Sequence, residues 1–315
     1  MSKIAFIYPG QGAQKAGMGA DFYENSEIAR YIFDQAGEEL DLDMKELCFE
    51  ENDRLDLTEY TQAAMVTTCL AMTRVAESKG LKADITAGLS LGEYPAIAAA
   101  GGMNDMDAIR PGRKRGILMQ NTVPAGEGAM CAVISMAAEE IEKVIEPIAD
   151  VSVANYNCPG QIVITGKTDA VEEAAAKLKE AGARRTIMLN VSGPFHSQML
   201  VPAGEKLAEE LEHTRFHELR IPYVTNVTAE KVTDIRETPG LLTTQISSPV
   251  RWMQSMERMI ADGVDTFVEI GPGKTLEGFL RKIDRSVKVF HISQWEDVDK
   301  VCEKLADGGN RMEES

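Results

Sequence analysis

The sequence has few cysteines, few histidines and a deficit of basic residues. Its five cysteines are odd in number and include no Cys-x-x-Cys pair, which is unlike a disulfide framework or a zinc site. Its 33 Lys and Arg are outnumbered by 50 Asp and Glu, which gives a net charge of −17. Nucleic-acid binding needs clustered basic side chains, so this balance argues against it. We expect reduced thiols in a cytoplasmic protein.

The sequence also lacks any apolar run long enough to span a membrane. The segment from Met1 to Tyr8 is unlike a signal peptide and enters a strand-like run directly. Apolar residues make up 44% of the 315 residues, enough for one large domain or a domain with a smaller one inserted. We therefore expect a cytoplasmic chain with no membrane partner.

Short apolar runs alternate with longer segments of helical period. This alternation predicts an α/β fold with a mainly parallel sheet. The predicted strands of this part are 4–8, 85–89, 223–227 and 266–270, and the predicted helices are 26–40, 61–79, 92–100, 201–212, 252–261 and 276–283.

The strongest local motif is Gly88-Leu89-Ser90-Leu91-Gly92, which fits Gly-x-Ser-x-Gly. It follows a predicted strand and precedes a predicted helix, as a nucleophile elbow requires. The glycines permit a tight turn, and the helix N-terminus favours developing negative charge. Chance supplies the bare pattern in about one chain in ten of this length, given usual Gly and Ser frequencies. The motif alone thus leaves an ordinary strand-to-helix loop as an alternative to a nucleophilic Ser90.

The pattern changes near residue 125. About 65 residues there follow a β-α-β-β-α-β order, which is the ferredoxin-like arrangement. We therefore expect an α/β-hydrolase-like large domain (1–124 and 195–306), an inserted ferredoxin-like small domain (125–194) and a polar, frayed tail (307–315). The predicted elements of the small domain are strands 129–134, 151–155, 161–165 and 185–190, and helices 138–148 and 169–181.

Four histidines are candidates for the base that a nucleophilic serine needs. His213 and His217 have a spacing that could bind metal on a helix, but no third ligand accompanies them. We interpret them as surface residues and expect no metal site. His291 falls in a predicted terminal strand, which indicates a structural role. His196 falls in a turn-rich loop between strand and helix, where catalytic side chains often lie, and is the best candidate base.

Two glycine-rich loops are incomplete nucleotide-binding motifs. Gly10-Gln11-Gly12 would need a third glycine where Lys15 stands, so the dinucleotide fingerprint fails. Gly273-Lys274-Thr275 would need an opening glycine where Val268 stands, so the P-loop fails. Both loops follow strands and can line a cleft at the carboxyl edge of the sheet. No bound cofactor is expected.

Seven segments, taken together, carry a resemblance that extends over nearly the whole chain. They are Pro9-Gly10-Gln11-Gly12-Ala13-Gln14, Gly88-Leu89-Ser90-Leu91-Gly92-Glu93-Tyr94, Arg115-Gly116 with Met119-Gln120, Asn155-Tyr156-Asn157-Cys158-Pro159-Gly160-Gln161, Gly193-Pro194-Phe195-His196, Gln245 with Pro249-Val250-Arg251-Trp252, and Glu269-Ile270-Gly271-Pro272-Gly273. In this order the segments resemble the motifs of malonyl-CoA:acyl-carrier-protein transacylases.

The resemblance implies an acyltransferase with a ping-pong mechanism. Ser90 would attack malonyl-CoA while His196 takes its proton, and the phosphopantetheine thiol of holo acyl carrier protein would then accept the malonyl group. The backbone N–H groups of Gln11 and Leu91 would form the oxyanion hole. The backbone carbonyl of Gln245 would orient the histidine in place of an aspartate.

The resemblance also implies how the substrate is selected. Arg115 would bind the free carboxylate of malonate bidentately, whereas on sequence grounds alone it is better interpreted as a solvated helix charge. Phe195 would crowd an α-methyl group. Leu89 stands where the family commonly has histidine, a departure that alters the polarity of the pocket. The implied substrate pocket comprises Gln62, Leu89, Met119, Asn157 and Phe195.

The leading hypothesis is therefore malonyl transfer for fatty acid synthesis by a monomer. An acceptor from polyketide synthesis stays open, and so does a thioester hydrolase that uses the same Ser90 and His196. A non-catalytic module that binds carrier protein is the alternative from a different functional class.

Overall fold

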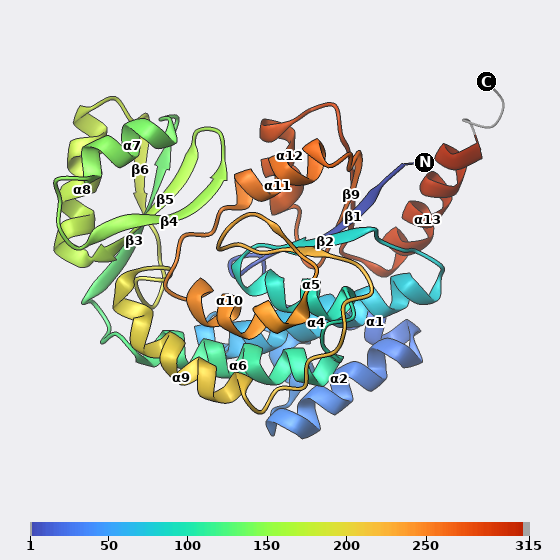
Figure 1. Cartoon of the computed structure of the whole chain (residues 1–315). Coiled ribbons are helices and arrows are strands. Elements are labelled where there is room, and N and C mark those ends of the chain that lie inside the picture. Colours follow the sequence, from blue (N-terminus) through green and yellow to red (C-terminus); the bar gives the residue numbers. More distant parts are fainter. Residues whose placement is uncertain (1, 311–315) are drawn as a thin grey trace.

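The computed structural model describes residues 2–310, which form a mixed α/β structure with two separate sheets (Figure 1). The larger sheet has six strands in the order β10-β9-β1-β2-β7-β8. Neighbouring strands pair in parallel except at the edge, where β7 and β8 are antiparallel. The strands are β1 (Ile4–Tyr8), β2 (Ile85–Gly88), β7 (Tyr223–Val224), β8 (Lys231–Val232), β9 (Thr266–Ile270) and β10 (Lys288–Ile292).

Helices cover both faces of this sheet, as a parallel sheet requires. The helices of this part are α1 (Ala20–Asn25), α2 (Glu27–Leu40), α3 (Met44–Phe49), α4 (Thr58–Ser78), α5 (Glu93–Ala99), α6 (Asp105–Asn121), α9 (Val201–Leu211), α10 (Thr238–Gln245), α11 (Trp252–Ala261), α12 (Thr275–Ile283) and α13 (Trp295–Asn310). None of the helices within residues 2–310 is long and apolar enough to cross a membrane.

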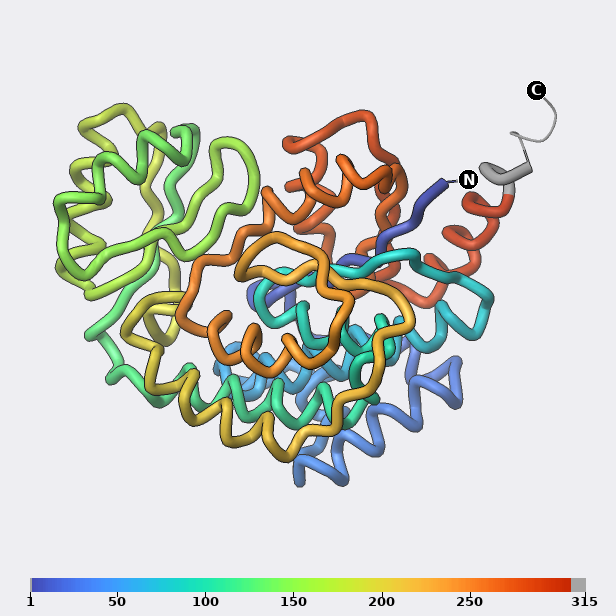
Figure 2. The backbone as a smooth tube through the Cα atoms, in the orientation of Figure 1, coloured from blue at the N-terminus to red at the C-terminus, as the bar shows by residue number. Residues whose placement is uncertain are grey.

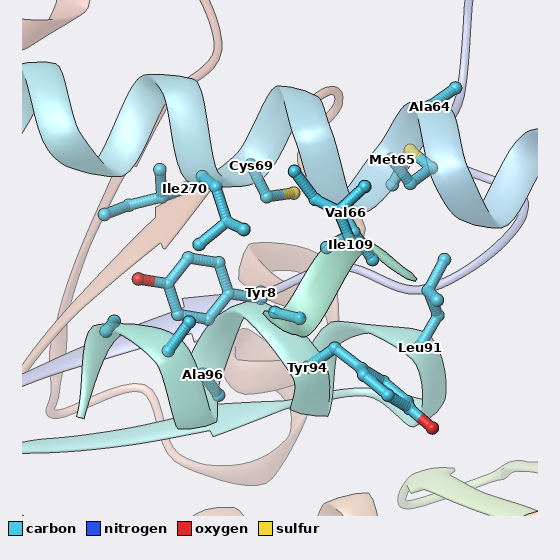
Figure 3. Packing of buried hydrophobic residues seen from close by; sticks show 14 of the residues in the cluster. Tyr8, Ala64, Met65, Val66, Cys69, Leu91, Tyr94, Ala96, Ile109 and Ile270 are labelled. Atoms are coloured by element: carbon cyan, nitrogen blue, oxygen red, sulfur yellow. The ribbon is translucent and has the colours of Figure 1, made fainter. Parts of the chain in front are cut away.

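The central strand β1 is buried on both faces because its side chains alternate between two cores. Phe6 and Tyr8 point into the core that includes α4, α5 and α6. Ala5 and Ile7 point into a second core with α11 and α12. Figure 3 shows Tyr8 between Cys69 of α4 and Ala96 of α5. The continuous apolar run at the start of the sequence is thus a strand with no solvent-facing side.

The smaller sheet is antiparallel and has the strand order β4-β5-β3-β6. Its helices bury Ile141, Val171 and Leu178 in a separate core. Figure 2 shows this green and yellow-green segment on one side of the rest of the chain. The elements are β3 (Gly128–Ile134), α7 (Ala138–Ile145), β4 (Val151–Cys158), β5 (Gln161–Lys167), α8 (Thr168–Glu180) and β6 (Arg185–Met188).

Most predicted elements are present, some with different ends, whereas α1, α3, α6, α10 and α13 were not predicted. The strand expected over 223–227 ends at Val224, because Asn226 turns its amide toward the end of β2. In contrast, β4 continues three residues beyond the prediction, to Cys158. The expected frayed tail is helical up to Asn310, and its last five positions, 311–315, lie outside the described residues.

Candidate active site

The Gly-x-Ser-x-Gly motif forms a sharp turn between β2 and α5, with Ser90 at the start of the 3₁₀ turn η1 (Ser90–Gly92). Ser90 has a φ of 53°, in the left-handed region that side chains rarely adopt. A Cβ atom on Gly88 would lie 1.8 Å from the Gly92 carbonyl oxygen, and one on Gly92 would lie 2.3 Å from the Tyr8 carbonyl oxygen. Both glycines are therefore required by close backbone packing, and the predicted elbow is confirmed as a local structure.

The elbow is held in place by the side chain of Asn226, which the sequence analysis missed. Its Oδ1 accepts the backbone N–H of Ser90 at 2.6 Å, and its Nδ2 donates to the Gly88 carbonyl at 2.7 Å. Asn226 is fully buried and follows β7, the strand beside β2. Nothing in the sequence singles it out, because the strand predicted over 223–227 contains Asn226 and its two partners lie more than 130 positions away.

Ser90 and His196 are in hydrogen-bond contact, with 2.7 Å between Oγ and Nε2. The other ring nitrogen, Nδ1, lies 2.9 Å from the backbone carbonyl oxygen of Gln245. A carbonyl can only accept, so Nδ1 carries the proton and Nε2 is free to accept one from Ser90. Burial, assisted by the nearby Arg115, lowers the pKa of His196 to about 3. The histidine is therefore neutral near neutral pH, as a general base must be.

Arg115 of α6 also reaches the nucleophile. Its Nη2 donates to Ser90 Oγ at 3.0 Å and to Gln245 Oε1 at 2.9 Å, and its Nη1 donates to Gln62 Oε1 at 2.9 Å. The side chain is 0% exposed, so the interpretation as a solvated helix charge is wrong. Burial lowers the pKa of its guanidinium.

The charge of Arg115 is held by neutral oxygens. No carboxylate within residues 2–310 forms an ion pair with it at 4 Å or less. A buried cation without a directly bonded anion is costly. This arrangement therefore favours a ligand that brings a carboxylate to the guanidinium.

The side-chain amide of Gln245 links three groups. Its Oε1 accepts from Arg115, while its Nε2 donates to the Ser90 carbonyl at 2.9 Å and to Glu93 Oε2 at 2.7 Å. Since the guanidinium can only donate and the carbonyl can only accept, the amide has one satisfactory orientation. The same residue therefore contacts the nucleophile, the base and the cation.

A cavity of about 430 Å³ opens at the Ser90–His196 pair, between the two sheets. Gln11 of the loop after β1 lines it, as do the predicted pocket residues Leu89, Asn157 and Phe195. Its remaining walls come mostly from the small sheet, the loop before His196 and α12: Met130, Asn155, Val163, Leu189, Val191, Thr275, Leu276 and Phe279. Such a largely apolar cleft with a few amide groups suits an acyl chain attached to an amide-bearing arm.

Two of the expected pocket residues lie beside Arg115 and not on the wall of the cavity. Gln62 and Met119 are buried behind the guanidinium of Arg115, where Gln62 Nε2 donates to the Met119 sulfur at 3.3 Å. They are absent from the cavity wall because α4 and α6 pack tightly together at this point. Both residues lie next to the predicted carboxylate clamp, and their contact with the substrate stays a prediction.

The loop after β1 is tied to the rest of the site through the side chain of Gln11. Its Nε2 donates to Thr58 Oγ1 at 3.0 Å, and that hydroxyl is 2.8 Å from Ser192 Oγ. Within the described residues, the backbone N–H groups of Gln11 and Leu91 donate to no protein acceptor. Both amides are therefore available for a negatively charged oxygen near Ser90.

Comparison with known proteins agrees with this arrangement. The family model described as "Acyl transferase domain" matches residues 5–296. The chain is 44% identical over 310 residues to the malonyl CoA-acyl carrier protein transacylase of Bacillus subtilis, covering 97% of this chain and 98% of that protein. It is 40% identical over 303 residues to the Staphylococcus aureus protein of the same name, covering 95% and 98%.

This chain belongs to the malonyl-CoA:acyl-carrier-protein transacylase family. Among solved structures, the Clostridium perfringens transacylase has a TM-score of 0.95 at 41% identity and covers 99% of this chain and 100% of that one. A malonyl-transacylase in complex with a type II polyketide acyl carrier protein has a TM-score of 0.93 at 35% identity, with coverage of 96% and 100%. The resemblance drawn from the motifs is thus confirmed.

The other histidines of this transacylase-family chain lie away from the site. His213 and His217 follow the end of α9 and do not share a helix, so the helical spacing considered for them does not exist. Residues 2–310 contain no group of three or more His, Cys, Asp or Glu side chains arranged to hold a metal. His291 lies in β10 with its Nδ1 3.4 Å from Glu277.

Proposed function

We propose that this chain transfers the malonyl group of malonyl-CoA to the phosphopantetheine thiol of holo acyl carrier protein. One observation carries the proposal: the guanidinium of Arg115 donates a hydrogen bond to the hydroxyl of Ser90, the candidate nucleophile. The free carboxylate of a malonyl group is separated from its thioester carbonyl by one methylene. A cation that touches Ser90 is therefore within reach of that carboxylate.

In the first half-reaction, Ser90 Oγ attacks the thioester carbonyl and its proton passes to Nε2 of His196. The backbone N–H groups of Gln11 and Leu91 stabilise the resulting oxyanion, a contribution typically worth about 3 kcal/mol for each donor. The intermediate then collapses, the carbon–sulfur bond breaks, and coenzyme A leaves as a thiol with the proton returned by His196. The products are a malonyl-serine ester, free coenzyme A and a neutral histidine.

The second half-reaction reverses these steps with another thiol. His196 takes the proton of the carrier protein's phosphopantetheine thiol, and the thiolate attacks the ester carbonyl. The same two amides stabilise the oxyanion, and Ser90 leaves with the proton from His196. Throughout, Arg115 pairs with the malonyl carboxylate while Gln245 orients both the arginine and the histidine.

The finer description of the fold belongs to the same proposal. The parallel sheet with a nucleophile elbow supports an α/β-hydrolase-like large domain from residues 1–124 and 195–306. The order β4-β5-β3-β6, with α7 and α8 in the same core, supports a ferredoxin-like small domain from residues 125–194. We further propose that the protein is a cytoplasmic monomer.

The relatives support fatty acid synthesis as the process supplied, and the solved complex with a polyketide carrier protein keeps that second acceptor in view. Coenzyme A release from malonyl-CoA, measured with and without holo acyl carrier protein, tests the transferase. We expect one rapid turnover without carrier protein and sustained turnover with it. Equal sustained rates in both conditions would instead identify a thioester hydrolase.

A further inference from the structure

Glu93 carries a buried carboxyl group and directly follows Gly92, the last residue of the Gly-x-Ser-x-Gly motif. It is the first residue of α5, directly after the Ser90 turn, and is 0% exposed. Its Oε2 accepts from Gln245 Nε2 at 2.7 Å and from the backbone N–H of Asn226 at 3.2 Å. Its Oε1 receives no hydrogen bond from the described residues. The mechanism above gives this carboxyl group no task.

The amide of Gln245 stands between Glu93 and Arg115. Its N–H side faces the carboxyl group and its oxygen faces the guanidinium, so the amide dipole lies favourably between an anion and a cation. Glu93 is consequently the counter-charge of Arg115, with the amide of Gln245 between them, since no carboxylate of residues 2–310 pairs with that guanidinium directly. Both partners are buried, so their interaction is weakly screened.

From this geometry, and building on the proposed function, we propose that Glu93 is a positioning residue that balances the charge of Arg115 in the empty site and takes up a proton when a malonyl carboxylate binds. With the malonyl group present, the pocket holds one guanidinium and two carboxyl groups, and only one of these can be ionised at low cost. The proton goes to Glu93 Oε1, which has no donor to oppose it, while Oε2 keeps its contacts with Gln245 and Asn226.

The direction of titration agrees with this role. Burial raises the pKa of Glu93 to about 7, while the hydrogen bonds from Gln245 and Asn226 and the charge of Arg115 oppose the rise. A malonyl carboxylate cancels the contribution of Arg115, so the pKa of Glu93 rises further on binding. A group whose pKa rises on binding takes up a proton, and binding weakens as the pH increases above the lower pKa.

The other ionisable groups around Glu93 are accounted for. Tyr94 on α5 and Tyr223 on β7 are buried with raised pKa values, so neither ionises near neutral pH. Arg115 on α6 stays protonated. His196 is the other group that could take up the proton. Arg115 contributes to its lowered pKa of about 3, so a carboxylate that neutralises Arg115 raises the pKa of His196 as well. A substitution at Glu93 is therefore needed to separate the two.

The test is calorimetric proton counting in two buffers of different ionisation enthalpy. The Ser90→Ala variant serves as background because it binds the thioester without forming an ester. At about pH 8, we expect malonyl-CoA to take up a fraction of a proton approaching one, and acetyl-CoA none. The affinity ratio of malonyl-CoA to acetyl-CoA should then fall by up to about tenfold per pH unit above pH 7. Acetyl-CoA shares the nucleotide phosphates, so their titration cancels.

Glu93→Gln in the same background should abolish the malonyl-specific uptake and flatten the pH dependence. The matched control is Glu269→Gln, which replaces another buried carboxyl group. Burial raises the pKa of Glu269 to about 7 as well, but its carboxylate accepts from the N–H groups of Leu276 and Glu277 at the start of α12. That variant should keep the uptake. If Glu93 had only a structural role, Glu93→Gln would take up as many protons on binding malonyl-CoA as the Ser90→Ala background does.

Equal proton uptake for malonyl-CoA and acetyl-CoA would overturn the inference, and that comparison needs no change at Glu93, so it stands even if Glu93→Gln fails to fold. Persistent uptake in Glu93→Gln would overturn it too and assign the proton to His196. Both results leave the proposed function intact if the unsubstituted chain forms a malonyl ester at Ser90. Absence of that ester would overturn both proposals.

Discussion

Nη2 of Arg115 lies 3.0 Å from Oγ of Ser90, and the same oxygen lies 2.7 Å from Nε2 of His196. The hydroxyl is thus placed between a cation and a neutral base inside the protein. This arrangement combines an activated nucleophile with a site for an anionic group on the acyl chain. The proposed selectivity for malonyl over uncharged acyl groups follows from that pairing.

Replacing Arg115 should remove that selectivity. Arg115→Ala should lower kcat/KM for malonyl-CoA, because it leaves the malonyl carboxylate desolvated without a partner. The expected loss of transition-state stabilisation is about 2–5 kcal/mol. Arg115→Lys keeps the charge but loses the planar fork that holds Gln62, Gln245 and Ser90, and should recover only part of the loss. Loading rates with malonyl-CoA and acetyl-CoA measure the preference, and an unchanged preference in Arg115→Ala would refute the clamp.

Asn226 should matter for both stability and rate. Asn226→Ala removes the acceptor of the Ser90 N–H and the donor to the Gly88 carbonyl. The free energy of unfolding should therefore fall by about 1–3 kcal/mol. The rate should fall as well, because the strained φ of Ser90 loses its support. Asn121→Ala is the control, since that exposed side chain donates only to a carbonyl within its own helix. Thermal unfolding and loading rates of the two variants should differ clearly.

The pH dependence of loading should reflect the neutral His196. Its pKa in the folded protein is lowered to about 3, chiefly by burial, so the base stays unprotonated well below its usual range. We expect kcat/KM for acetyl-CoA to lack the ordinary histidine limb near pH 6.5. For the same reason the neutral histidine contributes stability that is fully present above pH 6.5 and is lost as the pH falls toward 3. A limb near pH 6.5 in this profile would contradict the lowered pKa of His196.

Phe195 should restrict the size of the acyl group. Its ring is buried and lines the cavity next to His196. Phe195→Ala should therefore improve loading of methylmalonyl-CoA relative to malonyl-CoA by about 10- to 200-fold, the range that one methyl group commonly commands in a packed pocket. Competition between the two thioesters, read from the mass of the acylated protein, gives this ratio. A ratio equal to that of the unsubstituted chain would show that another wall excludes the methyl group.

Local patterns were sufficient for the parts of the fold that depend on periodicity. Strand β1 and the turn around Ser90 could be predicted, because a short continuous apolar run and two glycines that flank a serine are visible in the sequence itself. The roles of Asn226 and Glu93 left none, since each depends on contacts with residues more than 130 positions away. The burial of Arg115 was misjudged for the same reason: its partners come from α4 and α10, and spacing within α6 cannot reveal them.

Mass spectrometry of the protein after brief mixing with malonyl-CoA, in the absence of carrier protein, tests directly whether Ser90 is the nucleophile. We expect a mass increase of one malonyl group, located by peptide mapping at Ser90 and removed by holo acyl carrier protein. The Ser90→Ala variant should acquire none. An unmodified chain, or a malonyl group on another residue, would show that Ser90 is not the nucleophile for malonyl transfer.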